Sequence, residues 1–165
     1  MSQVKPAGLQ VSVLQAVLLV LFFWLFFYQW GAANLQGFLN YPMMRDMGEL
    51  VKTEEFIRLR VDVTAKIFPL LVIPFALSIL STIALTIFAP QFIPRRVLFI
   101  ILGLQAIIAT STIFIDAPIQ FQLNEVGHDM ALHVRLISTD FWLRKVPLQI
   151  EGGFVLYVLW RVVAR

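Results

Sequence analysis

Four apolar segments alternate with polar segments along this chain. Residues 11–30 are twenty consecutive positions without a charged side chain, and further apolar segments cover residues 67–89, 97–115 and 146–163. A helix of about twenty residues is about 30 Å long, which matches the hydrocarbon core of a bilayer. The pattern predicts an all-α integral membrane protein, with four transmembrane helices in one domain over residues 1–165.

Two long polar segments, residues 31–66 and 116–151, lie between the apolar ones. With four spans, both polar segments must lie on the same side of the membrane. The two termini and the connection at residues 90–96 then share the other side. We therefore expect an antiparallel four-helix bundle with two polar, partly helical excursions on one face.

Local signals divide the first polar segment into a turn and a helix. Asn40, Tyr41 and Pro42 predict a turn. Thr53 is an expected N-cap, and the helix that begins near Glu54 is expected to continue into the second span. Proline residues at the start of that span are expected to kink it.

Similar signals divide the second polar segment. Asp116, Ala117 and Pro118 predict a helix break or turn. Gly127 is expected to interrupt the next helix, and Asp129 is an expected N-cap. In the second span, small hydroxyl residues recur at helical spacing, which favours close helix–helix packing over a ligand-lining stripe; they are Ser78, Ser81, Thr82 and Thr86.

The composition supports the membrane class and excludes several chemistries. Apolar residues make up 59% of the chain and charged residues 14%, against about 45–50% and about 25% in soluble domains. The absence of cysteine excludes disulfides, thiol catalysis and cysteine-ligated metal sites. The net charge of +3 comes without a basic run interleaved with aromatic residues, so nucleic acid is not an expected partner.

The distribution of basic residues predicts the orientation in the membrane. Arg95 and Arg96 lie directly beside spans, together with Lys5, Arg161 and Arg165 on the side that holds the termini. That side has no acidic residue, whereas the positive charges of the polar excursions are largely neutralised. A count of lysine and arginine alone favours cytoplasmic excursions, whereas the crowding of basic residues beside the spans favours both termini in the cytoplasm, which is the orientation we expect. The expected location is a bacterial inner membrane.

The densest group of potential metal ligands is in the second polar segment. Glu125 and His128 are three residues apart, and Asp129 and His133 are four apart, so either pair shares one helical face. One E-x-x-H pair is half of a di-iron carboxylate set, which needs a second pair. Glu125 and His128 are the candidate metal ligands, a solvated helix start is the alternative, and no cofactor is expected.

Glu151 is an ionisable residue about one turn inside the last apolar segment. Such a residue is by default a candidate functional group, here a proton donor or acceptor. The alternative is an ion pair near the membrane surface with Arg144, Lys145 or a basic residue of the first excursion.

Several short motifs are similar to one known family. They are NYP at residues 40–42, KIFP at 66–69, IDAPIQFQL at 115–123 and HVRLISTDFWLR at 133–144. From residue 40 onward the chain resembles the anthrone-oxygenase-like family of small four-helix membrane proteins and related uncharacterised bacterial proteins. The matching positions are Pro118, Gln120, Leu123, His133, Leu136, Thr139, Asp140, Trp142 and Arg144.

The resemblance implies oxidation of an apolar substrate without an evident cofactor. This chain departs from the family at two places. It has FIRLR at residues 56–60, where relatives often carry a Tyr-His-x-x-His motif, and it lacks a histidine near Gln120.

Two functions follow as hypotheses. In the first, the protein handles an apolar small molecule at a polar cap, with oxygenase-like chemistry. His133 or Glu151 would transfer a proton, Arg144 would polarise a substrate oxygen, and the expected ligand contacts are Gln120, Asp140 and Trp142. In the second, the chain is a non-catalytic accessory subunit that packs against a larger membrane complex through its aromatic first span.

Overall fold

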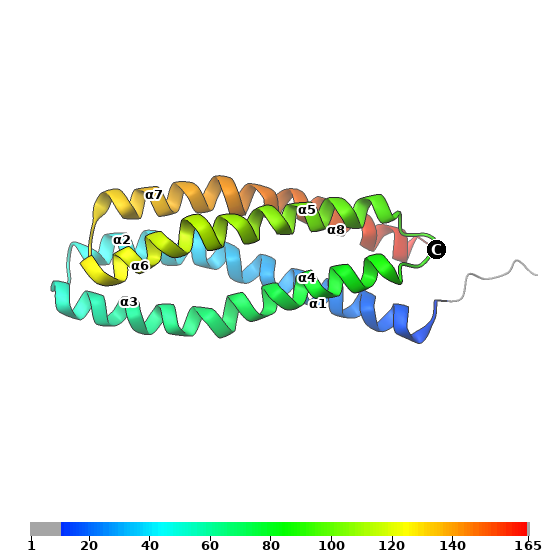
Figure 1. Cartoon of the computed structure of the whole chain (residues 1–165), viewed down its shortest axis with the longest axis horizontal. Helices are drawn as coiled ribbons and strands as arrows, with labels where there is room; N and C mark the ends of the chain where they lie inside the picture. The colour runs from blue at the N-terminus through cyan, green and yellow to red at the C-terminus, as the bar shows by residue number, and fades with distance from the viewer. Residues whose placement is uncertain (1–10, 165) are drawn as a thin grey trace, which may run out of the picture.

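Four long helices lie side by side along the long axis of the molecule (Figure 1). The computed structural model describes residues 11–164, and each long helix there has a π-helical turn between two α-helical parts. The first comprises α1 (Val13–Leu35), η1 (Gln36–Asn40) and α2 (Tyr41–Gly48), and the second α3 (Thr53–Ile67), η2 (Phe68–Val72) and α4 (Ile73–Ile87). The third comprises α5 (Arg95–Ser111), η3 (Thr112–Asp116) and α6 (Ala117–Val126), and the fourth α7 (Met130–Asp140), η4 (Phe141–Lys145) and α8 (Val146–Val163).

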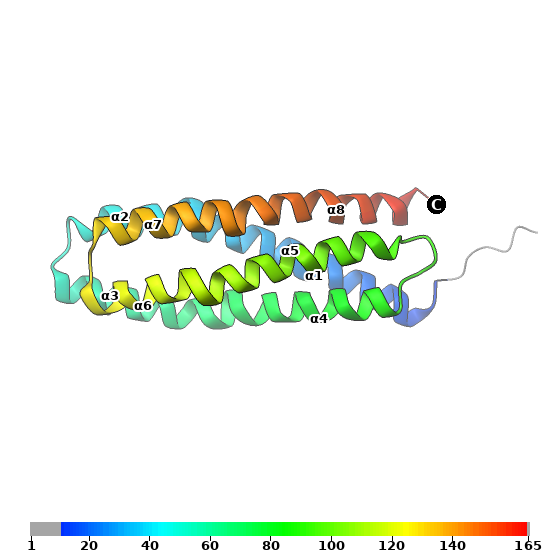
Figure 2. The same cartoon turned by 45° about the horizontal axis from the view of Figure 1, so that its top comes forward.

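Successive helices run in opposite directions. The connection between α4 and α5 lies at the same end of the bundle as the end of α8, and the α2–α3 and α6–α7 connections lie at the other end (Figure 2). The predicted antiparallel four-helix bundle is therefore confirmed. The polar segments extend the same four helices and do not form a separate cap.

The half of the bundle made by α1, α4, α5 and α8 is apolar inside and outside, and we call it the membrane half. Phe22, Leu98 and Val155 are buried in its core, whereas Trp24 and Leu80 are exposed on its outer surface. All four long helices are long and apolar enough to cross a membrane. This is the surface expected of an integral membrane protein, because lipid covers the outward side chains.

The half made by α2, α3, α6 and α7 carries most of the charged residues, and we call it the polar half. Its smaller core contains Tyr41, Ile119, Leu123 and Leu136. The four π-helical turns separate the two halves, and we call this level the π layer. The candidate site lies there.

Each π-helical turn ends two residues before a proline. Proline lacks an N–H, and its ring clashes with the carbonyl four residues earlier in an α-helix. A wider turn with i+5 hydrogen bonds moves that carbonyl away. Three such bonds run from the residue before the proline: from Tyr41 to Gln36, from Ala117 to Thr112 and from Val146 to Phe141. The four pairs are Asn40 and Pro42, Val72 and Pro74, Asp116 and Pro118, and Lys145 and Pro147.

Two predicted turns are wrong for this reason. The chain remains helical through Pro42 and through Pro118, because the π-helical turn accommodates the proline without ending the helix. The Asp129 N-cap prediction is confirmed, whereas Thr53 is the first residue of α3 and not its N-cap. α3 begins at Thr53, one residue before the expected start, and the Asp129 side chain caps α7 by accepting from the Leu132 N–H at 2.9 Å. Gly127 ends α6 with a φ of 79°.

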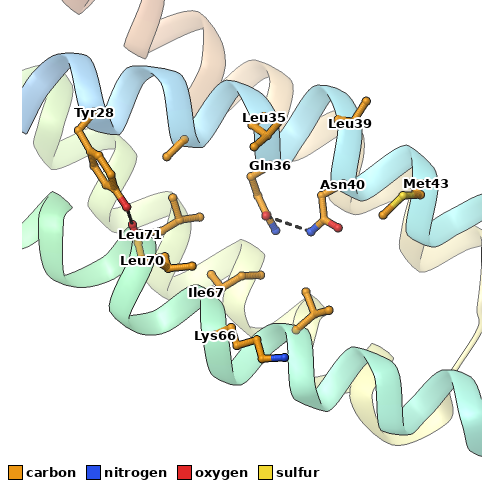
Figure 3. Close-up of a pocket in the computed structure, with 12 residues that line it drawn as sticks. Tyr28, Leu35, Gln36, Leu39, Asn40, Met43, Lys66, Ile67, Leu70 and Leu71 are labelled. Carbon is orange, nitrogen blue, oxygen red and sulfur yellow. Dashed lines mark hydrogen bonds between the residues drawn. The ribbon is translucent and has the colours of Figure 1, made fainter.

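Neighbouring helices supply donors to carbonyls that prolines leave free. Pro74 cannot donate to the Leu70 carbonyl, and the Tyr28 hydroxyl donates to it at 2.9 Å (Figure 3). Pro147 cannot donate to the Leu143 carbonyl, and Ser111 of α5 donates to it at 3.2 Å. In a membrane protein such bonds replace those that water would make.

The hydroxyl stripe of α4 packs against α5, as predicted. All four of its residues are buried. Thr82 donates to the Ser78 carbonyl at 2.8 Å, and Gln105 of α5 donates to the Thr82 hydroxyl at 3.2 Å. The small side chains let the two helices approach closely.

Candidate functional site

A buried cluster of four charged side chains occupies the π layer. Arg144 lies 3.0 Å from Asp140 Oδ1 and 3.5 Å from Asp116 Oδ2, so this arginine joins the third and fourth long helices. Lys145 lies 3.0 Å from Asp140 Oδ2. Asp116, Asp140 and Lys145 are buried, and Arg144 is largely buried. We call these four residues the ionic cluster.

The wide turn of η4 makes the Asp140–Lys145 pair possible. In an α-helix, residues five apart lie about 140° apart around the axis. A π-helical turn hydrogen-bonds residues five apart and brings them to nearly the same side. Arg144 and Lys145 therefore both reach inward to Asp140, although they are adjacent in the sequence.

The first long helix completes the surroundings of the ionic cluster. Lys145 donates to the Ala33 carbonyl at 2.6 Å. Gly37 leaves room for the pair, because a Cβ atom at this position would overlap the Lys145 ammonium and the Asp140 carboxylate. Tyr41 accepts from Arg144 at 3.4 Å, and Asp116 accepts from a threonine hydroxyl of α7 at 2.9 Å.

A groove of about 460 Å³ opens beside the ionic cluster, between α3–η2 and η3–α6. We call it the lateral groove. Its volume lies within the range of about 300–1,000 Å³ that is typical of ligand pockets. Its apolar wall consists of Val61, Ala65, Ile67, Leu71, Val72, Ala117 and Phe121. Its polar residues are Tyr41, Thr64, Thr112, Asp116, Gln120, Asn124 and Arg144.

A second cavity of about 460 Å³ lies on the other side of α3–η2, against α1 and α2. Figure 3 shows Leu35, Leu39 and Met43 along one wall and Ile67 and Leu70 along the facing one. A narrow space of about 10 Å³ lies between this cavity and the lateral groove and shares lining residues with both. It has room for about one water molecule. We call it the passage.

Arg60 of α3 lines the passage. Its side chain is buried, and its Nη2 donates to Gln120 Oε1 at 2.7 Å. No acidic side chain of the described residues lies within ion-pair distance of it. The passage therefore contains a buried guanidinium beside the lateral groove.

The structure brings three of the six predicted catalytic and ligand-binding residues to this region. Arg144 and Gln120 line the lateral groove, and Asp140, which does not line it, forms an ion pair with Arg144. Trp142 points outward, with 64% of its surface exposed, and packs edge-to-face on Phe141. It does not line the groove.

His133 lies deeper in the polar half. It is buried, with its ring 5.3 Å from the ring of His128 and 6.2 Å from that of Phe56. His133 and Arg144 are eleven positions apart, which is about 16 Å along a helix. In residues 11–164 no three histidine or acidic side chains gather as a metal site would need, so Glu125 and His128 have no third ligand there.

Glu151 lies in the membrane half, away from the other predicted catalytic residues. Its carboxylate accepts from Gln105 Nε2 at 2.9 Å, and Gln105 also reaches Ser78 and Thr82 of α4. The alternative of an ion pair with Arg144 or Lys145 is wrong, because both of those cations pair with Asp140. Glu151 lies about 10 Å along the helix from Arg144.

Sequence reasoning missed the roles of Arg60 and Lys145 and assigned Asp116 to a helix break. The spacing of four residues between Asp140 and Arg144 indicates an ion pair on one helical face and can be recognised in the sequence. The signal for Lys145 was Pro147 two residues later, which predicts a wide turn. Arg60 carried no local signal, because its partner Gln120 is sixty residues away.

Comparisons of this chain with protein-family models, with curated proteins and with solved structures gave no match. The resemblance to the anthrone-oxygenase-like family therefore stays a prediction from short motifs. Function is therefore inferred from the geometry of the lateral groove and its polar lining residues.

Proposed function

We propose that this protein binds a membrane-soluble small molecule in the lateral groove. The apolar part of the ligand lies against Ile67, Leu71 and Ala117, and an oxygen-bearing end meets Gln120 and Arg144. The groove lies at the level where the membrane half meets the polar half. A ligand that is dissolved in the bilayer therefore enters from the side.

The observation that carries this proposal is the composition of the groove wall. The accessible surface of the groove is mostly apolar, and a guanidinium, a carboxylate and two carboxamides are among its lining residues. Apolar walls with a few convergent polar groups are the usual form of a small-molecule site. Two carboxylates hold Arg144 at the groove wall, so its guanidinium is fixed in position before a ligand arrives.

The separation of the predicted catalytic residues supports binding as the core function. Arg144 borders the groove, whereas His133 and Glu151 lie about 16 Å and about 10 Å away along the fourth helix. A proton-transfer group must lie within hydrogen-bond reach of the reacting atom. Oxygenase-like chemistry with these three residues in one site stays a prediction.

Photolabelling tests the proposal. The probe is a long-chain alcohol that carries a diazirine and an alkyne, added to membranes that contain the protein. We expect crosslinks in residues 61–72 and 112–124. In Ala65→Trp, whose indole fills the groove, labelling of these residues should fall about tenfold. A tenfold change corresponds to about 1.4 kcal/mol of binding free energy.

The matched control is Ala106→Trp, which fills a shallower depression on α5 that has no charged lining residue. In this variant the photoprobe should label the groove as strongly as in the unchanged protein. Labels spread evenly over the lipid-facing surface, or unchanged by Ala65→Trp, would contradict the proposal. Copurification of one stoichiometric membrane protein that blocks labelling would favour the accessory-subunit hypothesis instead.

A further inference from the structure

Arg60 is a buried cation without a counter-charge among the described residues. Only 4% of its surface is exposed. Its Nη2 donates to the neutral Gln120 at 2.7 Å, and its Nε has no hydrogen-bond partner there. The guanidinium also lies 6.0 Å from the ring centre of Phe56. A cation–π contact of this kind offsets only a small part of the desolvation of a buried charge.

The ionic cluster does not supply the missing negative charge. Asp116 and Asp140 are held by Arg144, and Asp140 also by Lys145. Arg60 lies next to this level, in α3 of the polar half, and together with the ionic cluster it makes three buried or largely buried cations and two buried carboxylates. Buried charges in proteins are normally paired, so an anion from outside the chain would complete the set.

The lateral groove adjoins the space that Arg60 lines. The passage and the groove share Tyr41, Thr64, Ile67 and Gln120 as lining residues. The Gln120 carboxamide lines both spaces and bonds to the guanidinium. A head group that enters from the groove and replaces this carboxamide therefore meets Arg60 directly.

We propose that the ligand of the lateral groove is a long-chain carboxylic acid, whose carboxylate pairs with Arg60. This inference rests on the proposed function, since the acyl chain lies along the apolar wall of the groove. The wall extends from Val61 to Val72, which is about 16 Å along a helix, and its membrane end is formed by Leu71 and Val72. The chain thus points toward the bilayer and the head toward the polar half.

The size of the passage selects a carboxylate over a phosphate. The free space is only about 10 Å³, which holds about one water molecule. A carboxylate is planar and has the shape of the Gln120 carboxamide that it replaces. It also matches the planar fork of a guanidinium, with which it forms two parallel hydrogen bonds. A tetrahedral phosphate has a third oxygen and an ester oxygen in addition, and the free space of the passage does not hold them.

A pair of photoprobes that differ only in the head group tests this inference. One is the diazirine alcohol described above, and the other is the fatty acid of the same chain, both applied at pH 8.5. We expect the acid to label residues 112–124 about tenfold more strongly than the alcohol, because a charge-assisted bond to Arg60 adds to the same apolar contacts.

Gln120→Glu places a carboxylate of the same shape beside Arg60 and supplies the counter-charge from within the chain. We expect labelling by the acid to fall about tenfold and labelling by the alcohol to fall much less, because the introduced carboxylate still accepts a hydrogen bond from a hydroxyl. Arg60→Gln, which removes the charge, should act in the same direction. Asn124→Asp is the control, because it adds the same charge to the groove wall outside the passage. We expect labelling by the acid to fall less than threefold in this variant.

The outcomes separate this inference from the proposed function. Equal labelling by acid and alcohol, or equal losses in Gln120→Glu and Asn124→Asp, overturns the pairing with Arg60 but leaves binding in the groove intact. Absence of both labels from the groove overturns both proposals. Unlabelled oleate should compete with the acid probe. If lysophosphatidate or chloride at the same concentration reduces labelling by the acid as strongly as oleate does, the assignment of a carboxylate is overturned.

Discussion

Gly37 is the residue on which the ionic cluster depends most directly. It lies in η1, and any side chain there would occupy the space of the Lys145 ammonium and the Asp140 carboxylate. This close approach lets the ammonium reach the Ala33 carbonyl behind the carboxylate. A single missing Cβ atom thus allows the pair to be buried between two helices.

Gly37→Ala is expected to destabilise the protein by about 1–3 kcal/mol, because the buried ion pair must move apart. Better helix propensity of alanine offsets part of this loss, by up to about 1 kcal/mol. The measurement is equilibrium unfolding in mixed micelles. Gly31→Ala is the control, since nothing lies within 4 Å of a Cβ atom there, and it should be neutral or stabilising. Equal stability of both variants would show that the cluster does not need Gly37.

Individual residues were partly readable from the sequence. The predicted site residues Arg144 and Asp140 lie together as an ion pair, and their spacing of four residues explains why. Trp142 was chosen from the same motif, but the rotation of η4 turns it outward, with 64% of its surface exposed. Arg60 was missed because a buried, unpaired arginine looks the same in a sequence as a solvated one.

Among the elements, the π-helical turns explain the two wrong turn predictions. The interpretation of Asn40–Pro42 and Asp116–Pro118 as turns relied on proline as a helix breaker. In these helices each proline is accommodated by one wide turn, and the chain continues. The prolines at residues 74 and 147 are treated in the same way.

A double-mutant cycle between Ser111 and Pro147 tests whether a hydroxyl replaces the hydrogen bond that proline removes. Ser111→Ala should cost about 1 kcal/mol, because the Leu143 carbonyl then loses the hydroxyl that it shares with the Ile108 carbonyl of α5. In a Pro147→Ala background an N–H is restored at residue 147, and the cost of Ser111→Ala should fall toward zero.

Unfolding in mixed micelles measures all four proteins of this cycle. Ser81→Ala is the matched control, because the Ser81 hydroxyl donates to a carbonyl of its own helix at 2.8 Å. Its effect should be the same in both backgrounds. A cost of Ser111→Ala that does not depend on Pro147 would argue against the compensation.

For the whole molecule, the lengths of the helices set the position of the site relative to the membrane. The long helices contain 32–36 residues, or about 48–54 Å, whereas the hydrocarbon core is about 30 Å thick. Only part of each helix is therefore within lipid. The membrane half is the part without an ion pair among the described residues, so we expect the π layer to lie near one membrane surface.

The predicted orientation places both termini in the cytoplasm and the polar half on the opposite side. The chain has no cysteine, so single cysteines introduced at Leu50 and at Ala164 can be labelled without background. In sealed right-side-out vesicles we expect a membrane-impermeant maleimide to label Leu50→Cys and not Ala164→Cys. The reverse pattern would show the opposite orientation.

The sequence by itself determined the architecture: four apolar spans, antiparallel order, two polar segments at one end, and helix boundaries at Gly127 and Asp129. These features depend on the solvent and on neighbours within a few residues, so a local pattern contains them. Only the tertiary structure decided the site. The Arg60–Gln120 contact and the Asp140–Lys145 pair depend on how far each helix is rotated by its wide turn and which face it turns to its neighbour. That rotation results from packing between residues far apart in the chain, such as Gly37 against Lys145.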